Sequence, residues 1–356
     1  MNDHSTDEVK FSRMGGIGLI TMTRPRALNS LTLDMCLRMR AQMRDWAEDD
    51  TVGAVVIEGE GEKGFCAGGD IRALHDSGRE GTPYALEFYA NEYRLNNLIA
   101  HYPKPYVALM DGITMGGGVG VSVHGSHRVL TDRTVFAMPE TGIGLIPDVG
   151  GSYFLPRLPD EAGMFLGLTG ERIKAGDALD LVIGTHYVPG DVEAVKADLA
   201  KADFGGDPHK AVSSVLDAHA GLAPGAKLRT HRPAILKHFS GESVEAILDS
   251  LKKDGSEWAL GLAEIMRTKS PTSMKITFRQ IREGAELGVS DCLRLEFRLV
   301  SRIMEAHDFY EGVRAVIIEK DNKPDWNPAT LEEVSDAEIE SYFAPLGPRE
   351  LDLEAG

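Results

Sequence analysis

Cysteine is scarce in this sequence, which has three cysteines in 356 residues: Cys36, Cys66 and Cys292. They are too few and too far apart for a disulfide framework or a cysteine-based zinc site. Long apolar runs are missing as well, since no stretch of about eighteen uncharged apolar residues occurs. The sequence therefore argues against a disulfide-stapled secreted scaffold and predicts no membrane-spanning helix.

The N-terminal segment lacks the apolar core of a secretory signal. Residues 1–12 are polar and acidic instead, and we expect them to form a disordered lead. A low cysteine count is typical of proteins in a reducing compartment. Together these features predict a cytoplasmic protein.

Positive charge is also in short supply, because 38 Lys and Arg residues stand against 55 Asp and Glu residues, a formal net charge of −17. Nucleic acids and anionic membrane surfaces need a basic footprint, so we exclude both as partners. A small anionic ligand is compatible with this charge, because a few Arg or Lys side chains or backbone N–H groups are enough to hold it.

Several nucleotide-binding and catalytic signatures are absent. No Gly-x-Gly-x-x-Gly opens a strand–helix–strand unit with the expected acid, and no Gly-x-x-x-x-Gly-Lys-Ser/Thr loop occurs. A Gly-x-Ser-x-Gly elbow is missing, which argues against a serine hydrolase. His124 and His127 have the spacing of a ligand pair, but no third ligand is near them in sequence, so we interpret them as structural. No metal and no redox cofactor are predicted.

The first two-thirds of the chain alternates short apolar segments with glycine-rich turns and helical stretches. A helix is predicted from Leu33 to Ala47 by apolar residues at a 3.6-residue period, with Thr32 as its N-cap. Four segments are predicted as strands because they are β-branched or alternating and end at Gly, Asp or Pro: Ile17–Met22, Val52–Ile57, Tyr106–Met110 and His127–Ala137. Strand, helix, strand in that order indicates parallel pairing and a layered α/β core.

A partial internal repeat follows. Two predicted strands each lead through a turn into a glycine cluster, Gly64–Asp70 in the first unit and Gly116–Gly120 in the second. Glycine permits close backbone approach, and two preorganised N–H donors can stabilise an oxyanion in a water-poor pocket. The alternative is that each cluster is only a tight turn from strand to helix, with Cys66 a small buried residue. Two equivalent clusters favour an oxyanion hole.

Two acids stand in a nearly uncharged segment shaped by glycine and proline. Glu140 and Asp148 lie within Ala137–Gly151. A carboxyl group among apolar neighbours has a raised pKa, which suits proton transfer near neutral pH. Composition leaves a second interpretation open, in which Glu140 caps a helix and Asp148 is a turn residue.

From about residue 203 the sequence becomes rich in turn-forming residues, and after that its pattern is mostly helical. We therefore predict a core over residues 13–204 and a helical C-terminal region over residues 205–356. An apolar stripe of Leu293, Phe297, Val300 and Met304 supports the helical interpretation.

These segments resemble a known family. Thr23–Leu31, Gly64–Asp70 and Asp111–Gly120 resemble successive motifs of the crotonase (enoyl-CoA hydratase/isomerase) superfamily. Phe136–Leu158, Ser270–Lys275 and Asp321–Pro328 resemble its 3-hydroxyisobutyryl-CoA hydrolase branch in particular. The resemblance covers roughly residues 10–345 in the expected order, and several long motifs in order are far more specific than one.

The resemblance implies an α/β fold, a crotonase-like spiral of repeated ββα units with a helical C-terminal region. It implies a small-molecule acyl-CoA substrate, with CoA as part of that substrate rather than a cofactor, and a homo-oligomer. The oxyanion hole would be made by the N–H groups of Gly69 and Gly117. CoA would run beside the first glycine loop, where the matching positions are Arg26, Ala67, Gly69 and Asp70.

One departure separates the branches. Hydratases of the superfamily use two glutamates; this sequence has Gly120 at the first position and matches only the second, as Glu140. Asp148 stands where hydratases commonly have glycine, and both Asp148 and Glu92 match the hydrolase branch. A lone glutamate disfavours hydration, because it would have to handle both the proton and the water.

The resemblance therefore implies hydrolysis of a short 3-hydroxyacyl-CoA thioester, 3-hydroxyisobutyryl-CoA above all, as in valine catabolism. Glu140 would act as nucleophile or general base, and Asp148 would position the substrate hydroxyl or the water. Glu92, with Gly117, would help bind the substrate. The alternatives are an enoyl-CoA isomerase or hydratase, a catalytically silent acyl-CoA-binding protein, and a structural partner in a larger complex.

Overall fold

The computed structural model describes residues 7–354, which form two compact units, each discontinuous in sequence. Unit 1 contains the described residues up to Gly69, together with Arg94–Phe136 and Ile173–Ala226. Unit 2 contains Asp70–Tyr93, Ala137–Arg172 and the chain from Lys227 onward. The two units are described separately below.

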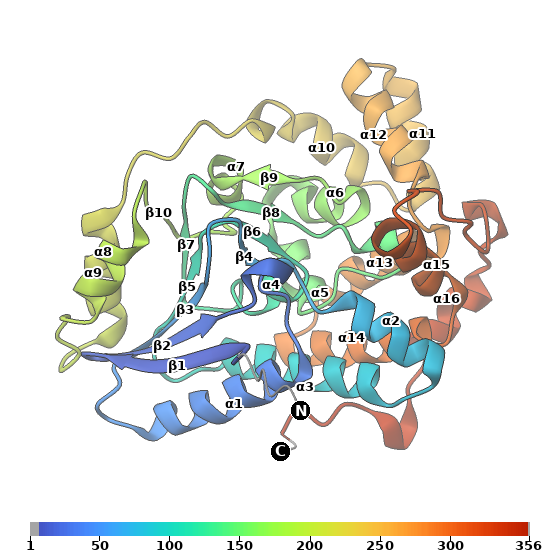
Figure 1. Cartoon of the computed structure of the whole chain (residues 1–356). Coiled ribbons are helices and arrows are strands. Elements are labelled where there is room, and N and C mark those ends of the chain that lie inside the picture. The colour runs from blue at the N-terminus through green and yellow to red at the C-terminus, as the bar shows by residue number, and fades with distance from the viewer. Residues whose placement is uncertain (1–6, 355–356) are drawn as a thin grey trace. The chain divides into compact units, whose positions relative to one another are not determined.

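Unit 1 is built on a large, mostly parallel sheet with the strand order β1-β2-β3-β5-β7-β10 (Figure 1). Its strands are β1 (Val9–Met14), β2 (Ile17–Met22), β3 (Ala54–Gly59), β5 (Tyr106–Met110), β7 (His127–Leu130) and β10 (His186–Tyr187). Only β1 runs antiparallel to its neighbour; β2, β3, β5, β7 and β10 pair in parallel. Strands β2 and β5 have the predicted bounds, and the predicted parallel core is confirmed.

A second, smaller sheet has the order β4-β6-β8-β9. It consists of β4 (Gly64–Cys66), β6 (Ile113–Met115), β8 (Val135–Ala137) and β9 (Ile173–Lys174). The chain alternates between the two sheets, since β3 is followed by β4, β5 by β6 and β7 by β8. The predicted repeat is therefore real, and it has a third copy that begins at β7.

The third copy explains one wrong prediction. His127–Ala137 was expected to be a single strand, but a turn divides it into β7 and β8, which belong to different sheets. The Thr134 hydroxyl accepts a hydrogen bond from the Thr131 N–H at 2.8 Å, and the Thr134 N–H donates to the Thr131 carbonyl at 3.1 Å. These threonines close the turn that separates the two strands.

Helix α1 (Leu33–Glu48) begins as predicted, with the Thr32 hydroxyl accepting from the Met35 N–H. The other helices of unit 1 are the part of α3 (Tyr84–Ala100) from Arg94 onward, α4 (Gly117–Gly120), α7 (Ala175–Asp180), α8 (Val192–Leu199) and α9 (Pro208–His219), with the 3₁₀ turn η1 (Pro25–Ala27). Valine and leucine side chains of α8 and α9 pack with those of β2, β3, β5 and β7 in one buried cluster. This cluster is the apolar core of unit 1.

The N-terminal prediction needs correction for the residues that are described. The lead was expected to be disordered up to Ser12, but β1 begins at Val9 and pairs with β2 over its whole length, from Val9 opposite Met22 to Met14 opposite Ile17. The strand is stabilised by this tertiary pairing rather than by its own short pattern. Residues 1–6 lie outside the described part of the chain.

Unit 2 is mainly helical. From the middle of the chain it takes α2 (Ile71–Glu80), the part of α3 (Tyr84–Ala100) up to Tyr93, η2 (Glu140–Ile143), α5 (Gly151–Phe154), η3 (Leu155–Arg157), η4 (Pro159–Glu161) and α6 (Ala162–Thr169). Its C-terminal part adds η5 (Leu228–Thr230), α10 (Arg232–Phe239), α11 (Val244–Asp254), α12 (Glu257–Arg267), α13 (Pro271–Gly284), α14 (Val289–Ile303), α15 (His307–Val313), the π-helix η6 (Arg314–Ile318), η7 (Leu331–Glu333), α16 (Asp336–Phe343) and η8 (Gly347–Arg349). Between residues 205 and 354 no strand occurs, in agreement with the predicted helical region.

The compact units differ from the predicted division at residue 204. The C-terminal helices pack on segments from the middle of the chain: α13 and α14 contact α5, and α15 contacts α2. The change in composition along the chain therefore gives a different domain boundary from the packing in three dimensions.

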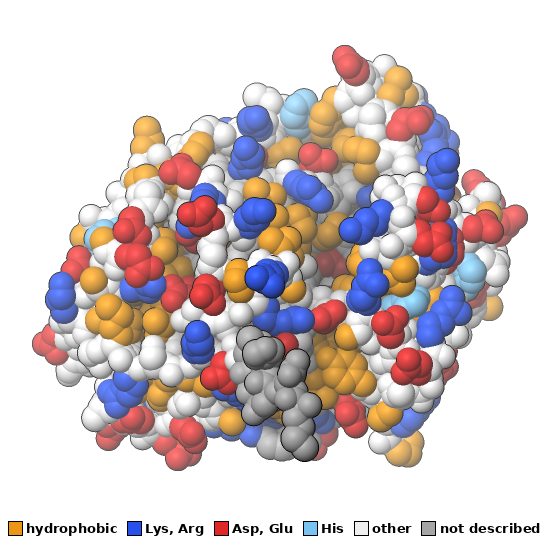
Figure 2. All heavy atoms as spheres, in the orientation of Figure 1, with side chains coloured by type: hydrophobic (Ala, Val, Ile, Leu, Met, Phe, Trp, Pro, Cys, Tyr) orange, Lys and Arg blue, Asp and Glu red, His pale blue; other side chains and the backbone are white. Residues whose placement is uncertain are grey.

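No helix among residues 7–354 is long and apolar enough to cross a membrane. Acidic and basic side chains are interspersed on the face drawn in Figure 2.

Candidate active site

The two glycine clusters lie against each other in unit 1. Gly68 has φ +115°, and a Cβ atom there would lie 3.7 Å from the Met115 carbonyl oxygen and 3.9 Å from the Gly117 nitrogen. A Cβ on Gly118 would lie 2.0 Å from the Cys66 carbonyl oxygen, so a side chain cannot fit at this position. The glycines thus permit a close approach of two backbone turns that follow the paired strands β4 and β6.

Gly69 and Gly117, the predicted oxyanion donors, belong to these two turns. Gly117 is buried at the start of α4, and Gly69 forms an isolated bridge with Leu31. Within residues 7–354, no backbone hydrogen bond uses the N–H of either glycine as its donor. Both N–H groups are therefore without a recorded acceptor among the described residues.

The predicted CoA-binding residues lie in or beside the first glycine turn. Arg26 is exposed in η1, and the Ala67 N–H donates to the Leu28 carbonyl at 3.0 Å, which ties the turn to the residue after η1. Asp70 is the N-cap of α2 and accepts from the Ala73 N–H. Arg24, by contrast, is held by an ion pair with Glu8 at 3.2 Å, which leaves Arg26 as the exposed cation of this loop.

Unit 2 contains a cluster of four buried acids, which we call the acid cluster: Glu92 on α3, Glu140 at the start of η2, Asp148 in the loop before α5, and Glu296 on α14. Their exposed fractions are 2%, 5%, 4% and 0%. No Lys or Arg forms an ion pair with any of them within residues 7–354. The structure thus brings together the three acids predicted from the sequence and adds a fourth.

Burial and mutual repulsion raise the pKa values of these acids. Removal from water raises the pKa of Glu140 well above its usual range, and the charge of Asp148 raises it further. Burial is also the main cause of the raised pKa of Glu92, followed by the charges of Asp148 and Glu140. Carboxyl groups of this kind can exchange protons near neutral pH.

Asp148 has its own stabilising partner. Burial raises its pKa to about 6, while a hydrogen bond from the Tyr93 hydroxyl to Asp148 Oδ2 at 2.7 Å acts in the opposite direction. Tyr93 lies on α3, one residue after Glu92. The carboxyl group of Asp148 is therefore fixed in orientation.

Two carboxylate oxygens of the cluster lack partners. Glu92 Oε1 and Glu140 Oε2 are buried and accept no hydrogen bond from residues 7–354. Buried acceptors are rarely left without donors in a folded protein. A ligand with hydrogen-bond donors fits this arrangement.

The loop of Asp148 adopts a strained conformation. Val149 has φ +53° and Gly150 has φ +87°, and a β-branched residue in this region is a genuine outlier. Glu296 stabilises the turn by accepting from the Gly150 N–H at 2.7 Å and the Ser152 N–H at 2.9 Å. Gln280 donates to the Pro147 carbonyl at 2.6 Å.

Sequence reasoning missed Glu296 and Tyr93. A signal for Glu296 was present, because it lies three residues after Leu293 and four before Val300, on the apolar stripe of α14. An acid on the buried face of an amphipathic helix has to have partners or a function. Tyr93 had no comparable signal, since a buried tyrosine is common in a helical core.

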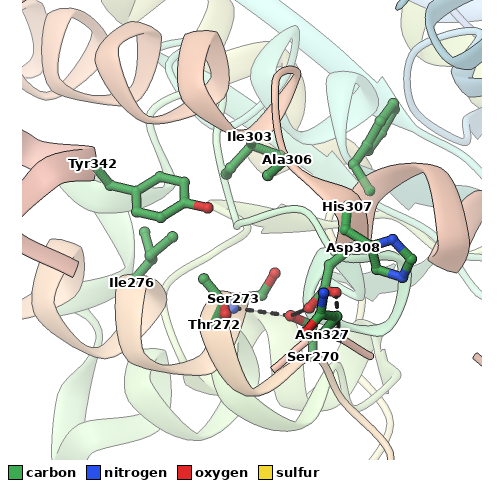
Figure 3. A pocket seen from close by; sticks show the side chains of 12 residues that line it. Ser270, Thr272, Ser273, Ile276, Ile303, Ala306, His307, Asp308, Asn327 and Tyr342 are labelled. Atoms are coloured by element: carbon green, nitrogen blue, oxygen red, sulfur yellow. Dashed lines mark hydrogen bonds between the residues drawn. The ribbon is translucent and has the colours of Figure 1, made fainter. Parts of the chain in front are cut away.

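Two further motifs of the hydrolase branch meet at a small cavity of about 20 Å³ in unit 2, which Figure 3 shows. Asp308 accepts from the Ser270 hydroxyl at 2.6 Å and from the Asn327 N–H at 2.9 Å. Ser270 also donates its backbone N–H to the Thr141 carbonyl at 3.1 Å. The cavity has room for about one water molecule, so these motifs fix the loop after Glu140 rather than hold an acyl group.

The comparisons with known proteins agree with these observations. Residues 17–343 match the family described as enoyl-CoA hydratase/isomerase. The chain belongs to that family. The chain is similar to a solved structure named as a carnitinyl-CoA dehydratase from Mycobacterium thermoresistibile, with a TM-score of 0.92 and 41% sequence identity. The match covers 98% of this chain and 100% of that one. An enoyl-CoA hydratase from Rhodobacter sphaeroides gives 0.88 at 38% identity, over 97% and 99%.

The chain also has curated relatives that are named as mitochondrial 3-hydroxyisobutyryl-CoA hydrolases. The Danio rerio protein is 47% identical over 359 residues, covering 99% of this chain and 94% of the relative. The Homo sapiens protein is 43% identical over 360 residues, covering 99% and 92%. The crotonase-like fold and the resemblance to the hydrolase branch are confirmed.

The predicted cytoplasmic location needs correction. The curated relatives are named as mitochondrial proteins, which contradicts the prediction. The prediction rested on a low cysteine count and a polar N-terminal segment. A low cysteine count is compatible with more than one compartment, so it could not distinguish between them.

Proposed function

We propose that this protein hydrolyses 3-hydroxyisobutyryl-CoA to 3-hydroxyisobutyrate and CoA, a step of valine breakdown. The observation that carries the proposal is the acid cluster, in which Glu92, Glu140 and Asp148 are buried together without a cation. The names of relatives 43–47% identical over nearly the whole chain support the same reaction.

Hydrolysis fits better than hydration, although the two most similar structures described above are named as a dehydratase and a hydratase. The position expected for the first hydratase glutamate is Gly120, buried in α4. Glycine has no group that can hold water or a proton. An enoyl-CoA isomerase needs only one acid, but it would leave Glu92 and Asp148 without a task.

In the proposed reaction the thioester carbonyl oxygen accepts hydrogen bonds from the N–H groups of Gly69 and Gly117. These donors stabilise the oxyanion that forms as oxygen adds to the carbonyl carbon, an effect worth roughly 3–4 kcal/mol per donor. The tetrahedral intermediate collapses with cleavage of the C–S bond, and the CoA thiolate takes up a proton.

Glu140 has two possible roles in this scheme. As general base it removes a proton from the attacking water; as nucleophile it forms a mixed anhydride that water then opens. A single turnover in ¹⁸O-labelled water tests the difference. Direct attack by water places the label only in the product carboxylate, whereas opening of the anhydride at the enzyme's carbonyl places it in Glu140.

The remaining roles follow from chemistry and position. Asp148, fixed by Tyr93, would orient the water or the substrate hydroxyl, and Glu92 would accept a hydrogen bond from that hydroxyl. Arg26, Ala67, Gly69 and Asp70 would lie along CoA, with Arg26 the cation available for a phosphate. A homo-oligomer remains a prediction.

The decisive experiment measures CoA release with a thiol reagent from 3-hydroxyisobutyryl-CoA, crotonyl-CoA and acetyl-CoA. We expect rapid release from the hydroxylated substrate only. Consumption of crotonyl-CoA without thiol release would instead identify a hydratase if the product has gained water, or an isomerase if it has the same mass. Tight binding of all three without turnover would indicate a silent acyl-CoA-binding protein.

A further inference from the structure

One face of helix α3 carries Glu92, a member of the acid cluster, together with two tyrosines. Tyr89, Glu92 and Tyr93 stand at positions i, i+3 and i+4, which share one side of a helix. The rings of Tyr89 and Tyr93 are 6.0 Å apart between centroids. Tyr93 uses its hydroxyl to fix Asp148, so its neighbour one turn earlier approaches the same group of acids.

Tyr89 differs from Tyr93 in having no partner for its hydroxyl. Its side chain is only 1% exposed, and the hydroxyl forms no hydrogen bond within residues 7–354. The charges of Asp148, Glu92 and Glu140 all act on this group and, together with burial as the main cause, raise the pKa of Tyr89. The phenol therefore keeps its proton and remains a hydrogen-bond donor.

A buried donor without an acceptor thus lies on the same helix face as Glu92, and two carboxylates of the acid cluster each have an acceptor without a donor. Tyr89 supplies the donor, and Glu92 Oε1 and Glu140 Oε2 are the acceptors. An alcohol complements this set, because its hydroxyl donates one hydrogen bond and accepts up to two. An acyl group without a hydroxyl leaves the phenol unpaired and provides no donor to the acids.

We propose that Tyr89 is a specificity-determining residue, whose hydroxyl donates a hydrogen bond to the 3-hydroxyl oxygen of the acyl group while a carboxylate of the acid cluster accepts from the same hydroxyl. This inference rests on the proposed function and adds to it the residue that distinguishes hydroxylated from plain acyl groups. A site built to bind a hydroxyl discriminates strongly against the analogue lacking it, because its own polar groups are then buried without partners.

A purely structural role for Tyr89 makes the opposite prediction about stability. A tyrosine hydroxyl that stabilises the fold has a partner in the folded protein, and its loss is destabilising. The Tyr89 hydroxyl has none among the described residues, so its removal should leave the thermal midpoint unchanged or higher. The two roles can be separated by measuring stability and substrate selectivity on one variant.

The test compares CoA release from 3-hydroxyisobutyryl-CoA and from isobutyryl-CoA, which has the same carbon skeleton without the hydroxyl. For Tyr89→Phe we expect the ratio of the two kcat/KM values to fall at least about tenfold. The decrease should come from the hydroxylated substrate, while isobutyryl-CoA is processed as fast as before or faster. The thermal midpoint should not decrease.

Two other tyrosines serve as matched comparisons. Tyr93→Phe removes the donor to Asp148, so CoA release should slow for both substrates, including isobutyryl-CoA, which Tyr89→Phe leaves unimpaired. Tyr102→Phe removes a hydroxyl that donates to the Met43 carbonyl at 2.7 Å, outside the acid cluster. That variant should lose stability without a change in selectivity.

The possible failures are distinguishable. A wild-type protein that releases no CoA from either thioester overturns the proposed function itself. A wild type that prefers the hydroxylated substrate, with an unchanged ratio in a folded Tyr89→Phe variant, overturns only the role of Tyr89. A Tyr89→Phe variant that fails to fold, as judged by circular dichroism, also contradicts the inference, because it shows that the hydroxyl is structural.

Discussion

Buried charge is handled in opposite ways in the two units. In unit 1, Lys196 is only 5% exposed and forms ion pairs with both Glu58 and Glu193. In unit 2, the four members of the acid cluster are as deeply buried, and their nearest charges are one another. The first arrangement satisfies its charges within the protein, whereas the second does not.

The difference indicates that the acid cluster lowers the stability of the folded protein and is kept for its chemistry. A buried cation that pairs with two carboxylates recovers much of the free energy lost by removing it from water, so deleting one member of the pair destabilises the protein. A group of buried acids without a cation gains nothing comparable, so such clusters occur mainly where a ligand or a proton supplies the missing interaction. Four predictions test this contrast.

The largest effect is expected at Glu140. Glu140→Gln keeps the shape of the side chain but removes its basicity, so CoA release from 3-hydroxyisobutyryl-CoA should fall by about 10³- to 10⁴-fold. Stability should stay constant or rise, because a buried ionisable group is lost. Glu58→Gln in unit 1 is the matched control: it should destabilise the protein and leave kcat per folded molecule unchanged. Retained activity in Glu140→Gln would remove Glu140 from the mechanism.

The next effect concerns stability alone. Lys196→Met leaves the half-buried carboxylate of Glu58, 16% exposed, without its cation and should lower the free energy of unfolding by about 1–3 kcal/mol. The double variant with Glu58→Gln should recover most of that loss, because neither charge is then isolated. Urea denaturation of the two single variants and the double variant measures the coupling. If the double variant is no more stable than the single ones, the two residues do not act as a pair.

A smaller loss of activity is expected at Glu296. In Glu296→Gln the amide can accept only through its oxygen, so the Gly150 and Ser152 N–H groups cannot both keep their acceptor. The strained turn should relax and Asp148 should be misplaced, lowering kcat roughly 10- to 100-fold with little change in KM. Asp291→Asn, an exposed acid on the same helix, serves as the control. Adding Val149→Gly should recover part of the activity, and no recovery would argue against strain as the cause.

Much of the fold could be predicted from local sequence. Strands β2 and β5 are β-branched or apolar segments that end at clear turn residues, and the Thr32 hydroxyl caps α1 as its position indicated. The prediction failed where pairing decides the structure. His127–Ala137 continues a strand-like pattern through a turn, and β1 is defined by its register with β2.

The site was predicted only in part for the same reason. Glu140 and Asp148 stand out locally because their surroundings are apolar, and Glu92 followed from the resemblance to the hydrolase branch. The contact between Glu296 and Gly150 joins residues 146 positions apart, so no local pattern contains it. The orphaned hydroxyl of Tyr89 is a property of the packed helix, and it too is invisible in the sequence.

The smallest predicted effects are opposite responses of the two units to pH. Burial raises the folded-state pKa of Asp148 to about 6 and that of Glu296 to about 8, above the ordinary value near 4. At pH values between about 4 and each of these raised pKa values, the folded state binds more protons than the unfolded state. The stability that these acids contribute is fully present below about pH 4 and is lost as the pH rises through about 6 to 8.

In unit 1, the contribution of His127 to stability changes with pH in the opposite direction. Its ring stacks with those of His186 and His209 and forms hydrogen bonds with the hydroxyls of Ser126 and Ser213. Burial, followed by the charges of the two neighbouring histidines and Arg128, lowers the pKa of His127 to about 4. The unfolded state then binds more protons between about pH 4 and 6.5, so stability is lost as the pH falls through this window.

Isosteric variants measured at pH 5 and pH 8 make this contrast testable. Relative to wild type, Asp148→Asn should gain stability at pH 8 and little at pH 5, because Asp148 is mostly protonated at the lower pH. His127→Gln should gain at pH 5 and not at pH 8. Each difference should approach about 1 kcal/mol per pH unit across its window, the value for one proton. Parallel pH responses of the two variants would contradict the opposite pKa shifts of Asp148 and His127.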